Sequence, residues 1–385
     1  MHFKRGKISK VRILLLLVIL LTVGLASSSC IQGLQPIGWS GGTVSDGVLF
    51  VGSKEGRLVT IGLVDETRHW SAPLKAEEQA GGFGCLPTGG AGCSNAPTGV
   101  AIYGTPVVAE DLVYIGGYNG KVYAFVSSSM GERWIYPRDD NLEPIVGGVA
   151  VAQDKIYFGS SDGMIYALDA ATGDKQWEFE TGDKVWATPA FKDDTLFIGS
   201  FDHKLYALWA ASGETKWEFE AEGAIASTPL IYDNTVYFGS FDRHLYAVDA
   251  ATGNLKWKFM GDNWFWAKPV IYDDIIYAAC LDGKVYALKS DSGDKIAEFD
   301  LGSPVSSSPV VVDDSIIFAS QKGVIYALDT GSKQLKRLND IEENVYGPLS
   351  ASEGIVYIHT QDLTLHRINV DTGAILMSIS LESME

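Results

Sequence analysis

The sequence predicts an all-β protein, an eight-bladed β-propeller of four-stranded antiparallel blades, from three observations. Between Trp39 and Ile379 the chain holds eight copies of one unit, and a fixed period of this kind is the signature of a repeat fold. The composition, with 42 Gly, 17 Tyr, 16 Phe and 10 Trp, suits short strands and tight turns. No segment after the N-terminus shows a sustained helical period of about 3.6. The central tyrosines recur every 40 residues, at Tyr166, Tyr206, Tyr246, Tyr286 and Tyr326.

Within one unit the pattern predicts four strands. In the unit that begins at Trp186, apolar strands are expected at 186–191, 196–199 and 205–209. Residues 216–220 alternate charged and aromatic side chains, as a half-exposed edge strand does. A meander of four strands cannot bury both of its faces alone, so the units are expected to pack radially against one another.

The first 29 residues have the pattern of a secretory signal peptide. Basic residues within 1–12 precede an apolar run at 13–26 and three serines. This run is shorter than the roughly 20 residues that a spanning helix needs. Cys30 follows the serines directly, and the arrangement resembles a bacterial lipoprotein signal, which implies lipidation of Cys30 and membrane attachment through it. Cleavage near Ser28 without lipidation, or a retained anchor, stays open as an alternative.

The propeller is expected to span residues 30–385, with a glycine-rich insertion at about 73–102. Cys85 and Cys93 lie in this insertion, and an oxidising compartment favours a local disulfide between them, which stabilises by roughly 2–3 kcal/mol in the loop-entropy model. Cys280 falls in an apolar stretch and is expected to be a buried free thiol. The sequence contains neither a Cys-x-x-Cys pair nor a His/Cys cluster, so nothing in it predicts a zinc site.

The formal charge of −18 excludes one class of function. Lys4, Arg5, Lys7, Lys10 and Arg12 lie in the signal segment, so the chain that follows them is more acidic still. Such a body repels a phosphate backbone. We therefore expect no nucleic acid among its partners.

The tract 165–177, Ile-Tyr-Ala-Leu-Asp-Ala-Ala-Thr-Gly-Asp-Lys-Gln-Trp, resembles the repeat of the PQQ-type β-propellers. Residues 205–217 and 245–257 match nearly as well, and the resemblance spans almost all of the mature chain. It implies that the closing tryptophan of a unit docks between blades, a role that falls to Trp70, Trp134, Trp177, Trp217 and Trp257. Ala297, Arg337 and Met377 stand at this register in the last three units, where different packing is expected.

Two branches of this family imply different functions. Quinoprotein dehydrogenases hold pyrroloquinoline quinone and calcium, but they are longer, and this sequence has neither their adjacent-cysteine disulfide nor an Asp-x-Asn-x-Asp-Gly calcium loop. Envelope lipoproteins similar to BamB, a subunit of the outer-membrane β-barrel assembly machinery, share the chain length, the eight units and the lipidated cysteine. The second branch implies a non-catalytic scaffold without cofactor or metal. A quinone-dependent oxidoreductase, or a surface protein that binds a glycan or small ligand, stays open as an alternative.

The repeated polar residues are expected to serve turns, because Asp and Asn tolerate the backbone of tight hairpins. His203 and His244 lie one unit apart without a carboxylate or cysteine set beside them, and are expected to be solvated turn residues. No nucleophile elbow, phosphate loop or His-Glu-x-x-His motif occurs, so no catalytic residue is predicted. The repeated acids are Asp193–Asp194, Asp233–Asn234, Asp273–Asp274 and Asp313–Asp314 in the first hairpin, and Asp162, Asp202, Asp242 and Asp282 in a second turn.

We therefore expect a monomeric propeller, lipid-anchored on the periplasmic or cell-surface side of a membrane, that binds a protein partner in the cell envelope. The segments that join one unit to the next differ most among the units, and variable loops on a rigid scaffold usually carry binding. Their large aromatic side chains are favoured interface anchors. The predicted partner-binding residues are Trp186, Trp264, Phe265 and Trp266. The alternative is that these residues fill the central channel.

Overall fold

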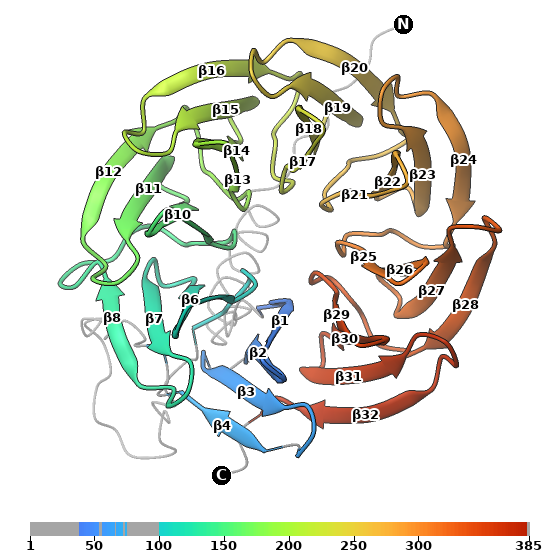
Figure 1. Ribbon diagram of the computed structural model, residues 1–385, viewed down its shortest axis with the longest axis horizontal. Coiled ribbons are helices and arrows are strands. Elements are labelled where there is room, and N and C mark those ends of the chain that lie inside the picture. Colours follow the sequence, from blue (N-terminus) through green and yellow to red (C-terminus); the bar gives the residue numbers. More distant parts are fainter. Residues whose placement is uncertain (1–37, 54–55, 66, 72–73, 75–99, 383–385) are drawn as a thin grey trace, which may run out of the picture. The chain divides into compact units, whose positions relative to one another are not determined.

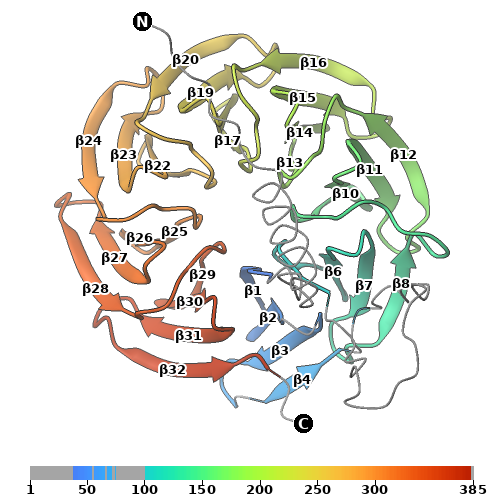
Figure 2. The same cartoon turned by 180° about the vertical axis from the view of Figure 1, so that it is seen from behind.

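The computed structural model describes residues 38–53, 56–65, 67–71, 74 and 100–382. Within the unit Ile37–Glu385 these residues form eight four-stranded antiparallel sheets around a central axis, here called blades 1 to 8 (Figures 1 and 2). Each blade consists of four consecutive strands, with its first strand nearest the axis and its fourth at the rim. The predicted eight-bladed propeller is confirmed.

The strands of blades 1 to 4 are β1 (Gly42–Ser45), β2 (Val48–Gly52), β3 (Leu58–Gly62), β4 (Arg68–Trp70), β5 (Val107–Ala109), β6 (Leu112–Gly116), β7 (Val122–Val126), β8 (Glu132–Tyr136), β9 (Ala150–Ala152), β10 (Lys155–Gly159), β11 (Met164–Asp169), β12 (Lys175–Glu180), β13 (Ala190–Lys192), β14 (Thr195–Gly199), β15 (Lys204–Trp209) and β16 (Thr215–Glu220). Those of blades 5 to 8 are β17 (Leu230–Tyr232), β18 (Thr235–Gly239), β19 (His244–Asp249), β20 (Leu255–Met260), β21 (Val270–Tyr272), β22 (Ile275–Ala279), β23 (Lys284–Lys289), β24 (Lys295–Asp300), β25 (Val310–Val312), β26 (Ser315–Ala319), β27 (Val324–Asp329), β28 (Leu335–Asp340), β29 (Ser350–Ser352), β30 (Ile355–His359), β31 (Thr364–Asn369) and β32 (Ile375–Ser380).

The first strand of blade 4 begins later than the sequence analysis expects. β13 starts at Ala190, directly after Pro189, and residues 186–189 belong to the connection from β12. Because Pro189 has no N–H to donate to a ladder, strand pairing starts after it. We call the segment that leads into the first strand of each blade a linker; in blades 2 to 8 it connects that strand to the last strand of the preceding blade.

The acidic first hairpins are confirmed as tight turns. Asp193 and Asp194 have φ angles of 46° and 59°, and Asp233 and Asn234 have φ angles of 41° and 55°. Two successive residues with positive φ match the right-handed twist of the strands that they join, and Asp and Asn tolerate this conformation.

The repeated aspartate of the second turn joins a blade to the linker before it. Asp202 accepts hydrogen bonds from the Tyr206 hydroxyl at 2.6 Å, the Lys204 N–H at 3.0 Å and the Gly182 N–H at 2.7 Å. Asp242 and Asp282 accept equivalent bonds from the tyrosine of their own blade and from the preceding linker. The repeated aspartates therefore serve the architecture, as the sequence analysis expects.

Tryptophans dock successive blades together. The indole N–H of Trp177 donates to the Ala210 carbonyl of the next blade at 2.9 Å, and that of Trp217 donates to Ala250 at 3.1 Å. Trp134 and Trp257 make the same contact at 3.0 and 2.9 Å. Removal of the apolar surface of one indole from water stabilises the folded protein by roughly 4–6 kcal/mol, whereas the hydrogen bond of its N–H contributes about 1 kcal/mol. The bond therefore chiefly orients the ring. The side chain of Trp70 lies outside the described part of the chain.

Each docked indole requires a glycine beneath it. A Cβ placed on Gly213 would lie 2.7 Å from the ring of Trp177, and Gly213 has a φ of +76°. The other three docked tryptophans meet Gly173, Gly253 and Gly293 in the same way. Where Ala297 replaces the tryptophan of blade 6, the corresponding position of blade 7 is Lys333, with a φ of 57°. The Lys333 ammonium donates to the Tyr277 hydroxyl of blade 6 at 3.2 Å. Lys333 therefore crosses the junction that lacks an indole.

The last two junctions use other donors, as expected for units without the tryptophan. Between blades 7 and 8, the Asn339 amide donates to the Gly373 carbonyl at 2.7 Å, while Arg337 pairs with Asp340 within its own strand. Between blades 8 and 1, the Arg367 guanidinium donates to the Leu63 carbonyl at 3.3 Å. Arg367 lies across the ladder from Met377, where other blades place alanine opposite tryptophan.

Blades 8 and 1 close the ring without exchanging a strand, and at two registers of this seam the residue types are the reverse of those in other blades. In blades 1 to 5 the second strand ends in a glycine that packs against a bulky linker residue, as Gly199 packs against Ile225. In blade 8 the second strand ends in His359, and Gly38 takes the place of the bulky linker residue. The imidazole Nδ1–H of His359 donates to the Ser40 carbonyl at 3.0 Å across the seam.

We predict that acid weakens the seam. Burial lowers the pKa of His359 below its ordinary 6.5 and outweighs the bond to Ser40, which raises it; burial also lowers the pKa of His366. The Nε2 atoms of both rings lack a hydrogen-bond partner among the described residues, so protonation there places an unpaired charge in the interior. Below pH ~6.5 these histidines therefore bind protons in the unfolded chain but not in the folded chain, which favours unfolding.

The free energy of unfolding should be constant above pH ~6.5 with respect to these groups, and should fall by up to about 1.4 kcal/mol per pH unit for each histidine as the pH drops towards the folded pKa. Urea unfolding at pH 7.5, 6.5 and 5.5 measures this slope. The His359→Gln variant, which keeps a polar side chain but does not titrate, should show about half of it. An unchanged slope in His359→Gln would contradict the assignment.

Candidate functional site

One end of the propeller gathers the segments that vary between blades. Because the four strands of a blade alternate in direction, the linkers lie at the same end as the turns between second and third strands, and we call this end the linker face. Backbone hydrogen bonds fix each turn to the linker beside it, with the Phe201 N–H donating to the Lys184 carbonyl at 3.0 Å and the Phe241 N–H donating to the Ala224 carbonyl at 2.9 Å. Corresponding bonds of 2.8 to 3.0 Å occur in blades 2, 3, 6, 7 and 8. The linker face is therefore a rigid frame.

One linker position carries an aromatic side chain in five of the eight blades. In the linker before blade 4, Val185 and Ala187 are buried, whereas Trp186 between them is partly exposed. The backbone alternation therefore turns Trp186 away from the blade interior. The residues at this position, in order from blade 1, are Trp39, Tyr103, Val146, Trp186, Ala226, Trp266, Ser306 and Tyr346.

Five rings form a first aromatic cluster across the linkers and turns of blades 4, 5 and 6. Trp264 stacks on Phe241 with centroids 4.4 Å apart and planes at 7°, and Trp266 lies 5.5 Å from the same ring. Phe241 meets Phe201 edge to face at 5.6 Å, and Phe201 meets Trp186 at 4.7 Å. The structure thus joins Trp186 to Trp264 and Trp266 through two phenylalanines that the sequence analysis did not single out.

Polar contacts hold Trp186 in this cluster. Its indole N–H donates to the Ser161 hydroxyl at 2.9 Å, and the Lys184 ammonium lies 5.2 Å from the Trp186 ring and 4.9 Å from the Phe201 ring. Cation–π contacts of this kind orient an aromatic surface that stays partly in water.

A second aromatic cluster lies at the seam of the ring, on the same face. Trp39 meets Tyr103 at 4.6 Å and Tyr346 at 5.5 Å, and Tyr103 lies 5.5 Å from Tyr118. Burial raises the pKa of Tyr103 to about 12, so its hydroxyl stays protonated. Sequence reasoning missed this cluster because it lies in the drifted first units and the last unit. The register shared with Trp186 and Trp266 was the signal that could have found it.

The predicted binding residues do not all reach the surface. Trp264 is 43% exposed and Trp266 is partly buried, but Phe265 is only 1% exposed. The Phe265 ring packs in the blade core near Tyr286, with centroids 5.9 Å apart. Phe265 is the bulky linker residue that faces the glycine at the end of β18, so its role is packing. The exposed surface is therefore made by Trp264, Trp266 and Trp186 without it.

Exposed acidic residues lie in the linkers of the blades that form the first cluster. Asp183, Glu222 and Asp262 are exposed in the linkers before blades 4, 5 and 6, with Glu222 and Asp262 at the same register. Burial raises the pKa of Asp242, but hydrogen bonds from Tyr246 and from the N–H groups of His244 and Glu222 outweigh it, so the pKa lies below its usual value. Lys258 pairs with Glu222 at 3.2 Å and Lys284 with Asp262 at 3.7 Å, so charges of both signs lie beside the aromatic rings.

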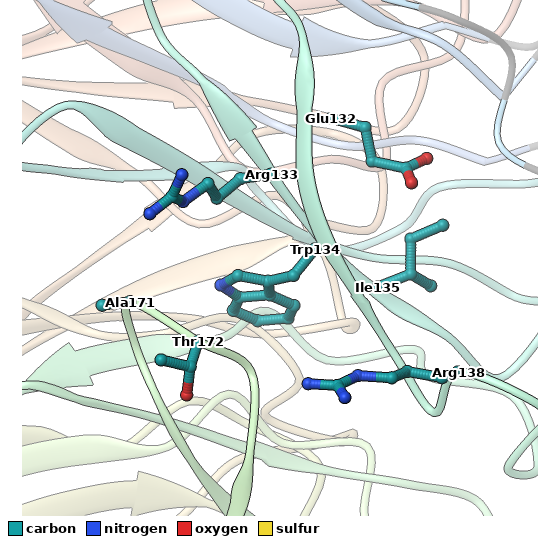
Figure 3. A pocket seen from close by; sticks show the side chains of 7 residues that line it. All are labelled: Glu132, Arg133, Trp134, Ile135, Arg138, Ala171 and Thr172. Atoms are coloured by element: carbon teal, nitrogen blue, oxygen red, sulfur yellow. The ribbon is translucent and has the colours of Figure 1, made fainter.

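A shallow pocket lies where the outer strand of blade 2 docks on blade 3. Its volume is about 450 Å³, and Figure 3 shows the Trp134 indole between the side chains of Arg133 and Arg138. Arg138 pairs with Asp174 at 2.8 Å, and both side chains are largely exposed. The pocket lining is Glu132, Arg133, Trp134, Ile135, Arg138, Ala171 and Thr172. The pocket follows from the docking of Trp134 and brings no reactive groups together.

The described residues hold no group of three or more His, Cys, Asp or Glu side chains that could bind a metal ion. His203 is an exposed turn residue as predicted, but His244 is the first residue of β19, is partly buried and contacts Asp242 at 3.2 Å, so the prediction of a solvated turn residue is wrong for His244. Cys280 is a buried free thiol, as predicted, although it follows β22 instead of lying within it, and burial raises its pKa to about 12. Cys30, Cys85 and Cys93 lie outside the described residues.

Among the described residues, no helix has the length and apolar character needed to cross a membrane.

Comparison with solved structures supports the fold. The crystal structure of the computationally designed Ika8 protein has a TM-score of 0.70 and 17% sequence identity, over 87% of this chain and 96% of that one. The crystal structure of BamB from Moraxella catarrhalis has a TM-score of 0.65 and 19% identity, over 85% and 92% of the two chains. Identities this low bear on the fold alone. Comparison with curated proteins finds no match.

The family comparison covers most of the repeats. The family described as outer membrane protein assembly factor BamB matches residues 86–179 and 161–378. Those residues include the 40-residue units, most of the docking tryptophans and most of the linker face. The chain therefore belongs to the family of outer membrane protein assembly factor BamB.

Proposed function

We propose that this protein is an exported, lipid-anchored, non-catalytic scaffold that binds a protein partner in the cell envelope and takes part in outer-membrane protein assembly. The observation that carries the proposal is the first aromatic cluster, which presents Trp186, Trp264 and Trp266 on a frame of repeated backbone hydrogen bonds. Large aromatic side chains held in one place lose little entropy on binding and are frequent energetic centres of interfaces.

The net charge of the chain specifies the partner further. The whole chain has a formal charge of −18, and Asp183 is exposed in the same linker as Trp186. A partner segment with apolar side chains flanked by Lys or Arg complements such a surface and associates faster at low salt. Membership in the BamB family supports a role in outer-membrane protein assembly.

The membrane anchor is tested at Cys30. In a host that lipidates exported proteins, Cys30→Ser should move the protein from the membrane fraction to the soluble envelope fraction, because the variant lacks the attachment site for acyl chains. Labelled palmitate should enter the wild type and not the variant. The matched control is Cys280→Ser, which places at this position the serine that blades 3, 4, 5 and 7 carry there, and which should stay with the membrane. A wild type that takes up no palmitate would contradict the anchor.

The binding face is tested by Trp186→Ala combined with Trp264→Ala. Affinity capture from solubilised envelopes, quantified by mass spectrometry, should show partner recovery at least tenfold below wild type, since each interface anchor contributes about 2 kcal/mol or more. Thermal unfolding should stay within a few degrees of wild type.

The control is Trp209→Ala, which removes an equally exposed tryptophan, 42% exposed, from the other end of β15. It should leave recovery unchanged. Equal recovery by all three proteins would show that the linker face does not bind the partner. A stability loss above about 3 kcal/mol in the double variant would show that the rings are packing.

A further inference from the structure

The outer strand of every blade is an edge. β4, β8, β12, β16, β20, β24, β28 and β32 each pair with a neighbour on one side within the described sheets. The backbone groups on the other side can pair with a strand of another chain, and proteins usually protect such edges with charged side chains. Seven of these strands contain at least one Lys, Arg, Asp or Glu, whereas β32, with the sequence Ile-Leu-Met-Ser-Ile-Ser, contains none.

The repeat shows which charges β32 lacks. Leu376 stands at the register that lysine occupies in β16, β20 and β28, and Ser378 stands at the register of a charged residue in β12, β16, β20 and β24. The side chains of Leu376 and Ser378 are exposed, and so are most of the residues at the same registers in the other outer strands. The protection that the repeat gives to other edges is therefore absent from this one.

β32 is firmly held on its inner side. Ile379 is 1% exposed and packs in a core cluster with Leu365, Tyr357 and residues of blade 1. Ile375 and Leu376 are 42% and 52% exposed on the same strand. Figure 1 places β32 at the outer rim, between β28 and β4. The edge is thus a rigid extended template with apolar side chains in solvent.

We propose that β32 is a docking edge for an extended, uncharged segment of another protein, which adds a fifth strand to blade 8. Main-chain hydrogen bonds supply the affinity of such strand addition, and side chains at alternate positions supply its selectivity. A strand beside β24 or β28 sets its side chains against Lys, Glu or Asp, whereas one beside β32 meets Leu376 and Ser378. The segment that fits alternates apolar and small polar residues.

The negative charge of the chain favours a different protein, and not a second copy of this chain, as the partner of β32. Two copies of this chain paired through β32 would bring together two bodies with a formal charge of −18 each. A neutral or basic partner meets no such repulsion.

The test uses the full-length protein and a labelled peptide with the sequence of β32 as the uncharged strand. Fluorescence anisotropy should show saturable binding to the wild type. Leu376→Lys installs a charge that the repeat itself carries at this position, and should weaken binding at least tenfold without lowering the unfolding temperature; Ser378 is kept, because its hydroxyl contacts the His366 imidazole at 2.9 Å. Ile296→Lys, at the register of Leu376 in the already charged β24, is the matched control and should bind like the wild type.

Backbone methylation separates strand addition from simple apolar adhesion. Of two peptides methylated on alternate backbone nitrogens, one should keep binding and the other should lose it, because only alternate N–H groups face the edge. Equal binding by both peptides, no binding to the wild type, or self-association through β32 seen by sedimentation would overturn the proposal. Trp186→Ala with Trp264→Ala should leave peptide binding unchanged, so this test fails or succeeds independently of the linker face.

Discussion

A four-stranded blade exposes two apolar faces and can bury them only against its neighbours, and the whole ring depends on that constraint. The docked tryptophans bury these faces most fully, because each indole fills the junction between two blades. Its N–H donates a hydrogen bond to one carbonyl of the next blade, as Trp177 donates to Ala210. The glycine beneath the ring follows from the same contact, since a Cβ on Gly213 would lie 2.7 Å from the indole. One pair of positions thus accounts for two of the periodic signals in the sequence.

The junctions without tryptophan show that the constraint can be met by other chemistry. Lys333, Asn339 and Arg367 each carry a polar side chain across a junction whose indole is missing. The seam between blades 8 and 1 departs furthest, with the buried imidazole of His359 at the register where blades 1 to 5 have a glycine. Closure that rests on His359 is sensitive to protonation, whereas the docking bond of each tryptophan junction joins an indole N–H to a backbone carbonyl, and neither group titrates near neutral pH. The same last blade bears the uncharged edge β32.

Local and periodic features were predictable from the sequence, and features that join distant residues were not. The 40-residue period predicts the blades, the acidic hairpins and the docking role of Trp177. The start of β13 was placed too early, because Pro189 continues an apolar run whose pairing it prevents. Phe265 lies between two exposed tryptophans, and only its partner glycine on β18 shows that it is buried. The glycine at position 38 and the histidine at position 359 could not be connected from the sequence, because residues about 320 positions apart meet at the seam.

The central claim, that indole docking holds successive blades together, is tested most directly by hydrogen exchange of the tryptophan indole N–H groups, followed by NMR on protein labelled with ¹⁵N-tryptophan. The account predicts that the indole protons of Trp134, Trp177, Trp217 and Trp257 exchange slowly and at similar rates, because each opens only when two blades separate. The exposed Trp209 and Trp264 should exchange at least about a hundredfold faster. Fast exchange at the four docked indoles, equal to that of Trp209 and Trp264, would contradict it.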